Sequence, residues 1–201
     1  MQRPRRLPSF FTGVILAAGL LCGFCCPAAL AEPVANVQHT YYPVDGLTAS
    51  QIRDALDRNT PVRKNGKTFD AYTRWNVAWQ FYWTPDNSGT CRITSVSTTV
   101  RIHYTLPRLQ ANADRPLGLE SRWKQFIAAL VAHEKGHAAL GVKAAREIER
   151  RLAQIEERDS CHQLEADANR LAEEIIAQYA RIEDQYDADT DHGAGDGARF
   201  P

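Results

Sequence analysis

The apolar residues of this 201-residue chain change their spacing partway along the sequence. Between residues 75 and 104 they alternate with polar or small residues, a period of two that is typical of β-strands. From residue 120 to about 157, and again over residues 161–186, they recur at the three- and four-residue steps of an amphipathic helix. Turn-forming residues at 84–90 divide the first region. The spacing therefore predicts a long antiparallel β-hairpin followed by a hairpin of two long helices.

A strand and a short helix are expected before the β-hairpin. The segment around Tyr41 and Tyr42 is extended and aromatic, and Thr48 is placed to cap a short helix with Ile52 and Leu56 inward. Residues 187–201 are rich in Gly and Asp and have no period, which predicts an irregular tail. We therefore expect one α+β domain over residues 32–201, with the β-hairpin packed on the helical hairpin.

Residues 1–31 are organised like a secretory signal peptide. A basic start and an apolar stretch lead to the small residues Ala29 and Ala31, which predict cleavage after Ala31. Retention of this stretch as a membrane anchor is the alternative. No later stretch is long and apolar enough to span a membrane. We expect an exported protein, periplasmic or extracellular, with no stable membrane insertion after cleavage.

Signal cleavage would leave two cysteines, Cys91 and Cys161. An even pair in an exported protein predicts a disulfide. The alternative, free thiols or zinc ligands, finds only His162 as a neighbouring ligand at short spacing. The mature chain would carry 21 basic and 24 acidic side chains, and it has no basic patch that would indicate nucleic acid binding.

The stretch LVAHEKGHAAL at residues 130–140 contains an HExxH motif. His133 and His137 lie one helical turn apart and can face a single zinc ion, while Glu134 can take a proton from a zinc-activated water. The alternative is two histidines on the inner face of an ordinary helix. The motif continues the apolar stripe that includes Leu130, and buried polar groups are costly unless something satisfies them. This phase favours the metal-binding interpretation.

A catalytic zinc site needs a third protein ligand. If the two long helices turn back near Asp159, residue 135 lies opposite residue 183, and Glu165 is left roughly 27 Å from the site. The same reflection brings the end of the second helix and the tail to the motif. We expect His192 as the third ligand because imidazole is a common zinc ligand. The alternatives are Glu183, Asp184 and Asp187.

Two glycines interrupt the helix that carries the motif. Gly136 and Gly141 each cost about 1 kcal/mol relative to alanine in a helix interior, so we expect them to let another backbone, such as a substrate strand, come close. Tyr186 and His103 are weak candidates for an oxyanion stabiliser, with packing or surface roles as the alternative. The edge of the β-hairpin could hold a peptide by strand addition.

Several further motifs are spread over the mature chain. They are YYPVxGxT at residues 41–48, WxVxW at 75–79, WxxF ahead of HExGHA at 133–138, and YDxxTxHG followed by GAxFP at 186–201. Together they resemble a bacterial domain-of-unknown-function family described as predicted secreted zinc-dependent proteases. The resemblance implies a metallopeptidase with a zincin-like site. It also places His192 in the family's C-terminal motif, which supports it as the third ligand.

The expected function is therefore hydrolysis of a peptide or protein substrate by a zinc metallopeptidase. One Zn²⁺ would be held by His133, His137 and His192, and the motif's glutamate would act as general base. The alternative is a non-catalytic binding or assembly module, in which a fourth ligand such as Asp187 or Asp191 closes a structural metal site. A metal-dependent hydrolase of something other than peptides also fits these residues.

Overall fold

The computed structural model describes residues 33–64 and 66–201, so the expected signal peptide lies outside the described residues. The chain forms a mixed α+β structure, which confirms the expected fold class. Its elements, in chain order, are β1 (Val34–Val44), α1 (Ala49–Asn59), β2 (Arg63–Lys64), β3 (Lys67–Thr68), β4 (Tyr72–Pro85), β5 (Cys91–Leu109), α2 (Leu117–Leu152), α3 (Cys161–Thr190) and the 3₁₀ helix η1 (Ala194–Asp196).

A three-stranded sheet forms one layer of the molecule, with the strand order β1-β5-β4. Strands β4 and β5 make the expected antiparallel hairpin, paired from Tyr72 opposite Thr105 to Pro85 opposite Cys91. Strand β1 pairs with β5 in parallel, and this pairing was not predicted. It begins at Val34, seven residues before the aromatic pair that predicted a strand. As a result β4 lies at one edge of the sheet and β1 at the other.

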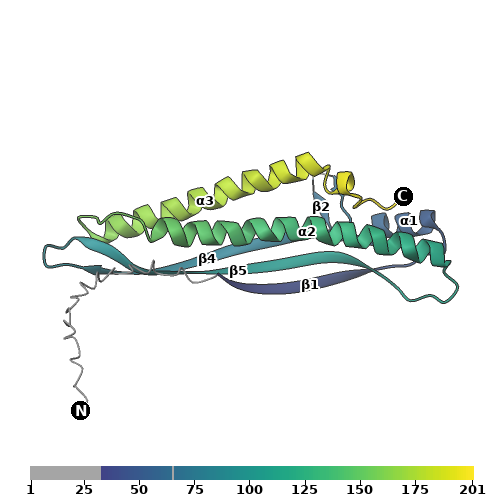
Figure 1. The fold of residues 1–201 in the computed structure, drawn as a ribbon, viewed down its shortest axis with the longest axis horizontal. Coiled ribbons are helices and arrows are strands. Elements are labelled where there is room, and N and C mark those ends of the chain that lie inside the picture. Colours follow the sequence, from purple (N-terminus) through teal and green to yellow (C-terminus); the bar gives the residue numbers. More distant parts are fainter. Residues whose placement is uncertain (1–32, 65) are drawn as a thin grey trace, which may run out of the picture.

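The two long helices run along the sheet and cover one of its faces (Figure 1). Alternate residues of β5 point at the helices and are buried, as the period of two predicts. The main core is made by this row, by α1 and by the first half of α2. A second cluster, of Ile148, Leu152, Ala168, Ala172 and Ile175, joins α2 to α3. Trp75 and Trp79 of β4 pack against these two clusters, so both tryptophans of the WxVxW motif lie on the covered sheet face.

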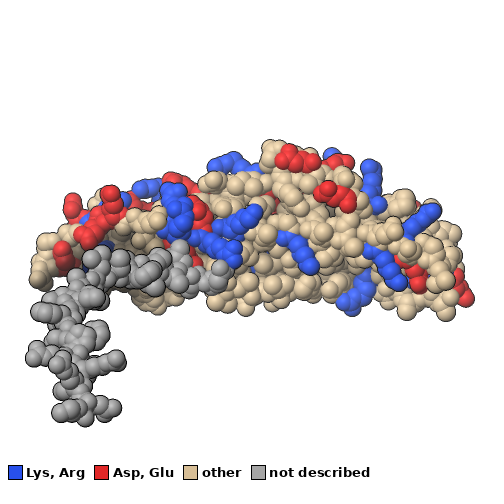
Figure 2. Space-filling model, in the orientation of Figure 1, with Lys and Arg blue, Asp and Glu red and all other residues tan. Residues whose placement is uncertain are grey.

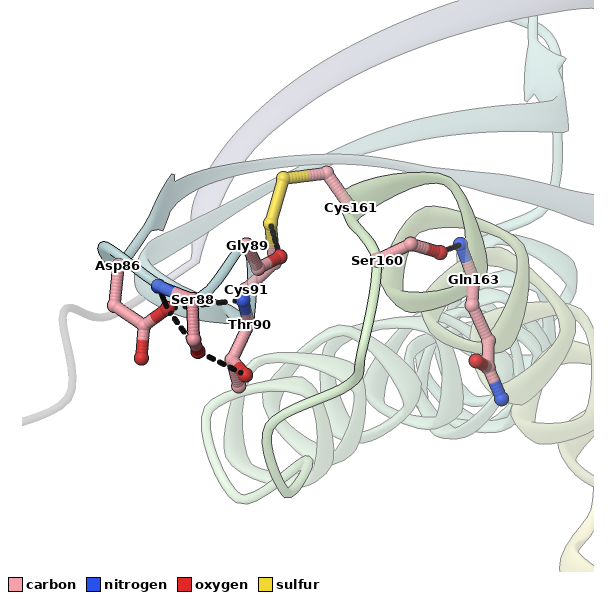
Figure 3. Close-up of a disulfide and its surroundings, with 8 residues drawn as sticks. All are labelled: Asp86, Ser88, Gly89, Thr90, Cys91, Ser160, Cys161 and Gln163. Carbon is pink, nitrogen blue, oxygen red and sulfur yellow. Dashed lines mark hydrogen bonds between the residues drawn. A yellow bond between two sulfur atoms is a disulfide. The ribbon is translucent and has the colours of Figure 1, made fainter.

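A disulfide between Cys91 and Cys161 ties the start of β5 to the start of α3, which confirms the predicted pairing (Figure 3). Two backbone hydrogen bonds between Cys91 and Arg158 support the same junction. Helix α2 ends at Leu152, earlier than expected, and Ser160 caps α3 by accepting a hydrogen bond from the Gln163 backbone N–H. The two helices therefore turn back close to the predicted position.

The C-terminal tail is more ordered than its composition predicted. Helix α3 continues to Thr190, so residues 187–190 are helical rather than irregular. Asp191 and His192 then adopt left-handed backbone conformations, with φ of 49° and 51°, and turn the chain back. Phe200 is buried against Trp123 and Phe126, which anchors the tail to α2.

Helix α3 rises away from the strands toward its C-terminal end (Figure 1). The short β2–β3 ribbon lies near this end of the molecule, and the tail folds back there. No helix among the described residues is long and apolar enough to cross a membrane.

Candidate metal centre

The three residues of the HExxH motif are buried on α2. His133 is 5 % exposed, Glu134 4 % and His137 6 %, so the motif lies on the inner side of the helix as its phase predicted. The i, i+4 spacing stacks the two imidazoles one turn apart, with ring centroids 4.8 Å from each other. Their Nε2 atoms lie 3.1 Å apart and point to a common position.

Asp187 of α3 completes this cluster. Its Oδ1 atom lies 3.2 Å from His133 Nε2 and 3.0 Å from His137 Nε2. With the separation of the two nitrogens, these contacts form a nearly equilateral triangle of metal-ligand atoms. Four ligands at the usual zinc distances of about 2.0–2.1 Å would be separated by about 3.3 Å in a tetrahedron. The three side chains therefore fit three corners of a tetrahedral zinc site.

His192, the expected third ligand, does not join this triangle. Its Nδ1 atom lies 3.4 Å from the other oxygen of Asp187, Oδ2, and its side chain is 51 % exposed. The imidazole also leans against Phe69, with ring centroids 5.0 Å apart. The structure thus brings together His133, His137 and Asp187, and Asp187 was one of the alternative ligands. Of the Asp187 carboxylate, His192 contacts only the oxygen that faces away from the two histidines.

Helical phase is the sequence signal that favours Asp187 over His192. Tyr179, Glu183 and Asp187 follow each other at four-residue steps, so Asp187 continues the inner stripe of α3. The prediction that α3 ended at residue 186 hid this continuation. The predicted antiparallel turn does bring residues 183 and 187 opposite His137.

Glu183 lies behind His137 and not in the triangle. Its Oε1 atom lies 3.2 Å from His137 Nδ1, and this buried nitrogen makes no hydrogen bond within the part of the chain that the structure describes. The indole N–H of Trp75 donates to the same oxygen at 3.1 Å. Rotation of the carboxylate would let His137 donate its Nδ1–H to Glu183 and keep Nε2 free for a metal, as outer carboxylates do for ligand histidines. Asp184, another alternative ligand, is exposed and lies 3.9 Å from Lys64.

Glu134 is held by a threonine of β4. The Thr73 hydroxyl, which is buried, lies 2.5 Å from Glu134 Oε2 and 3.1 Å from the Glu134 carbonyl oxygen. Burial raises the pKa of the Glu134 carboxyl, and the hydrogen bond from Thr73 partly offsets that rise. One oxygen of the carboxylate is thus fixed, and Oε1 is left available to the cavity that Glu134 lines.

Charges within the triangle are strongly coupled. Burial lowers the pKa of His137, but the carboxylates of Asp187 and Glu183 outweigh it and raise this pKa to about 9. Burial raises the pKa of Asp187, but hydrogen bonds from His133 and His137 outweigh it and bring this pKa well below its usual range. Without a metal ion the Asp187 carboxylate therefore favours the protonated form of His137, and a metal ion bound to Nε2 would displace that proton.

Close neighbours of the two helix glycines are protein side chains. A Cβ on Gly136 would overlap the phenol ring of Tyr186, and a Cβ on Gly141 would meet Trp75 Cγ at 2.7 Å. The sequence led us to expect close approach of another backbone, such as a substrate strand, and the structure places side chains of α3 and β4 there instead. Because these two residues have no side chain, α3 and β4 can pack closely against α2.

The two weak candidates for an oxyanion stabiliser, Tyr186 and His103, have the packing and surface roles that were given as the alternative. The Tyr186 hydroxyl donates to the His133 carbonyl oxygen at 3.3 Å while its ring stacks on the His133 imidazole. His103 Nε2 lies 2.7 Å from the Thr40 hydroxyl at an exposed position of the sheet. Tyr186 packs on His133, and His103 belongs to the sheet surface.

A cavity of about 800 Å³ opens beside the triangle. Its walls come from the β2–β3 ribbon, the start of β4, the end of α3 and the tail. Basic side chains that line it include Arg63, Arg74 and Arg199. On the face shown in Figure 2, acidic side chains gather around the turn between α2 and α3, with a smaller group over the C-terminal part of α3, and basic side chains are spread along the molecule.

The fold and this cluster define an α+β protein in which two buried histidines and a partly exposed aspartate could hold a metal ion beside an open cavity. Residues 39–193 match the model of a bacterial protein family of unknown function (DUF922), and the chain belongs to that family. No curated protein and no solved structure gives a match. The function is therefore argued from the site.

Proposed function

We propose that this protein is a zinc-dependent metallopeptidase in which His133, His137 and Asp187 hold one zinc ion. The observation that carries the proposal is the triangle of ligand atoms with sides of 3.0–3.2 Å, next to a buried glutamate and an open cavity. The resemblance of the motif to zincin sites supports the same assignment. Asp187 takes the place first expected for His192.

In the proposed hydrolysis, the zinc ion and Glu134 would have separate roles. A bound zinc ion would act as a Lewis acid and make water a nucleophile near neutral pH. Glu134 would accept the proton of the attacking water on the oxygen that Thr73 leaves free, and then pass it to the leaving amine. The raised pKa of this buried carboxyl suits a group that accepts and returns a proton.

An open coordination position is what separates a catalytic zinc site from a structural one. Within residues 33–64 and 66–201, the group of ligand atoms contains three side chains and no fourth. This supports the peptidase over the alternative of a binding or assembly module with a closed metal site.

We also propose that the substrate is a peptide or an extended protein segment. The cavity is large enough for a short stretch of chain, and the start of β4 at the sheet edge lies in its wall. An exported location agrees with the disulfide at Cys91 and Cys161, which is typical of oxidising compartments.

The test is peptide hydrolysis by purified protein loaded with zinc, measured beside zinc content. Glu134→Gln removes the proton acceptor and keeps the shape of the side chain, so it is expected to retain about one zinc ion per chain and lose turnover by about 10³-fold. His137→Ala is expected to lose both zinc and activity.

Two outcomes would contradict the proposal. Hydrolysis at the wild-type rate by zinc-loaded Glu134→Gln would exclude the base assignment. Zinc retained by wild-type protein with no hydrolysis of any peptide in a mixed library would favour a structural metal site instead.

A further inference from the structure

We propose that the groove between β4 and α3 contains a second binding site, which takes an apolar side chain of the substrate about four residues from the cleaved bond. This inference rests on the proposed peptidase function. It predicts which side chain the enzyme prefers at one position of the substrate, and the metal centre alone does not determine that preference.

The site is a cavity of about 290 Å³ between the edge strand and the helix. Its walls are mainly apolar, and Glu173 and Asn76 are the polar residues among them. The apolar lining residues are Trp75, Val77, Trp79, Ile176 and Ala177. An apolar hollow of this size is suited to a leucine or an aromatic side chain, which is stabilised by leaving water.

The two indole rings of this cavity are held in place by hydrogen bonds within the protein. Trp75 donates its N–H to Glu183 Oε1 at 3.1 Å, and Trp79 donates its N–H to Asn169 Oδ1 at 2.9 Å. Both polar atoms are thus satisfied, and the apolar parts of the rings remain for contact. A wall fixed in this way is preformed, so a ligand loses little free energy in ordering it.

Trp75 connects this cavity to the metal centre. It lines the cavity, and its indole N–H donates to Glu183, which lies 3.2 Å from His137 Nδ1. Thr73, two residues earlier on the same strand, bonds Glu134. Strand β4 and helix α3 therefore form the walls of both cavities, which follow each other along the sheet edge.

The spacing along β4 sets the distance from the cleaved bond. Val77 lies four residues beyond Thr73, and a strand rises about 3.3 Å per residue, so the cavity is about 13 Å from the general base. An extended substrate that runs along β4 has the same rise. Its side chain at about the fourth residue from the cleaved bond then reaches the cavity.

The experiment uses zinc-loaded protein and a set of quenched fluorescent peptides that differ at one position. Phenylalanine, leucine, serine or glutamate is placed three, four or five residues from the cleaved bond, on either side. An apolar residue at one of these positions is expected to raise kcat/KM about tenfold over serine, through KM. Ala177→Trp fills the cavity and should remove this preference. Ala166→Trp, an exposed alanine on the same helix outside the cavity, should keep it.

Binding of the same peptides to zinc-loaded Glu134→Gln, followed by fluorescence anisotropy, separates this inference from the proposed activity. A preference that Ala177→Trp removes in binding, without hydrolysis by the wild type, would uphold the cavity and refute the peptidase. Hydrolysis with no apolar preference, or with a preference that Ala177→Trp leaves intact, would overturn the cavity's role.

Discussion

Thr73 and Glu134 form a contact between β4 and the HExxH motif that would support turnover under the proposed peptidase function. Thr73→Val keeps the shape of the side chain and removes the hydrogen bond to the carboxylate. Such bonds to charged groups are worth about 1.5–3 kcal/mol, so kcat is expected to fall by about tenfold to a hundredfold. Steady-state kinetics with zinc content checks this, and Thr73→Ser should restore most of the rate. Full activity in the valine variant would show that Glu134 needs no such support.

His137 gives the metal-free protein a pH-dependent stability. Its pKa is raised to about 9 in the folded protein, against 6.5 for the free side chain. A raised folded pKa contributes stability that is fully present below about pH 6.5 and is lost as the pH rises through about 9. The loss is up to about 3 kcal/mol. Urea unfolding in chelator at pH 6.5 and 9.0 measures it, and His137→Asn should flatten the difference. An equal pH dependence in both proteins would contradict the ion pair.

At the scale of single residues, the sequence predicted three of the residues that meet at the candidate metal site. His133, Glu134 and His137 follow from a local spacing on one helix, and their burial agrees with the apolar phase around them. The choice between Asp187 and His192 depended on where α3 ends, and helix ends are poorly fixed by local sequence. Thr73 approaches Glu134 from a strand 61 residues away, and no short-range pattern in the sequence reports such a contact.

Helices α2 and α3 meet closely at Gly136. Gly136→Ala would normally favour a helix by about 1 kcal/mol, but its Cβ would overlap the Tyr186 ring. We expect net destabilisation of about 1–3 kcal/mol in urea unfolding, since an overpacked contact forces neighbours to shift. Gly118→Ala on the same helix has open space and should be neutral or slightly stabilising. Equal effects of the two substitutions would exclude the close approach.

Strand pairing could be predicted from the sequence where the two strands are neighbours along the chain, and not where they are far apart. The β4–β5 hairpin follows from two alternating segments joined by a turn, and the helical hairpin follows from one break in a long helical period. Parallel pairing of β1 with β5 joins residues 34–44 to residues 99–109, across α1 and the whole of β4. The distance in sequence and the exposed, mixed composition of β1 leave no local signal for that register.

At the scale of the whole molecule, helix α3 carries the disulfide in its first turn and Asp187 of the candidate metal site near its other end. Asp187 lies 26 residues beyond Cys161 on α3, which is about 39 Å of helix. Replacement of Cys91 and Cys161 by alanine is expected to lower the free energy of unfolding by about 4 kcal/mol, because the bridge closes a long loop. Zinc affinity at the distant centre should change by less than about twofold. Loss of zinc binding by this double variant would mean that the two ends are coupled.

The ligand set is tested most directly by zinc titration of three proteins at one pH, with a competing chelator. We expect the wild type to bind one zinc ion. In Asp187→Ala the Kd should rise at least about a hundredfold, because a ligand is lost, whereas in His192→Ala, which touches only the outer oxygen of that carboxylate, it should rise about tenfold or less. The opposite order, with His192→Ala losing zinc and Asp187→Ala retaining it, would contradict the His133–His137–Asp187 centre.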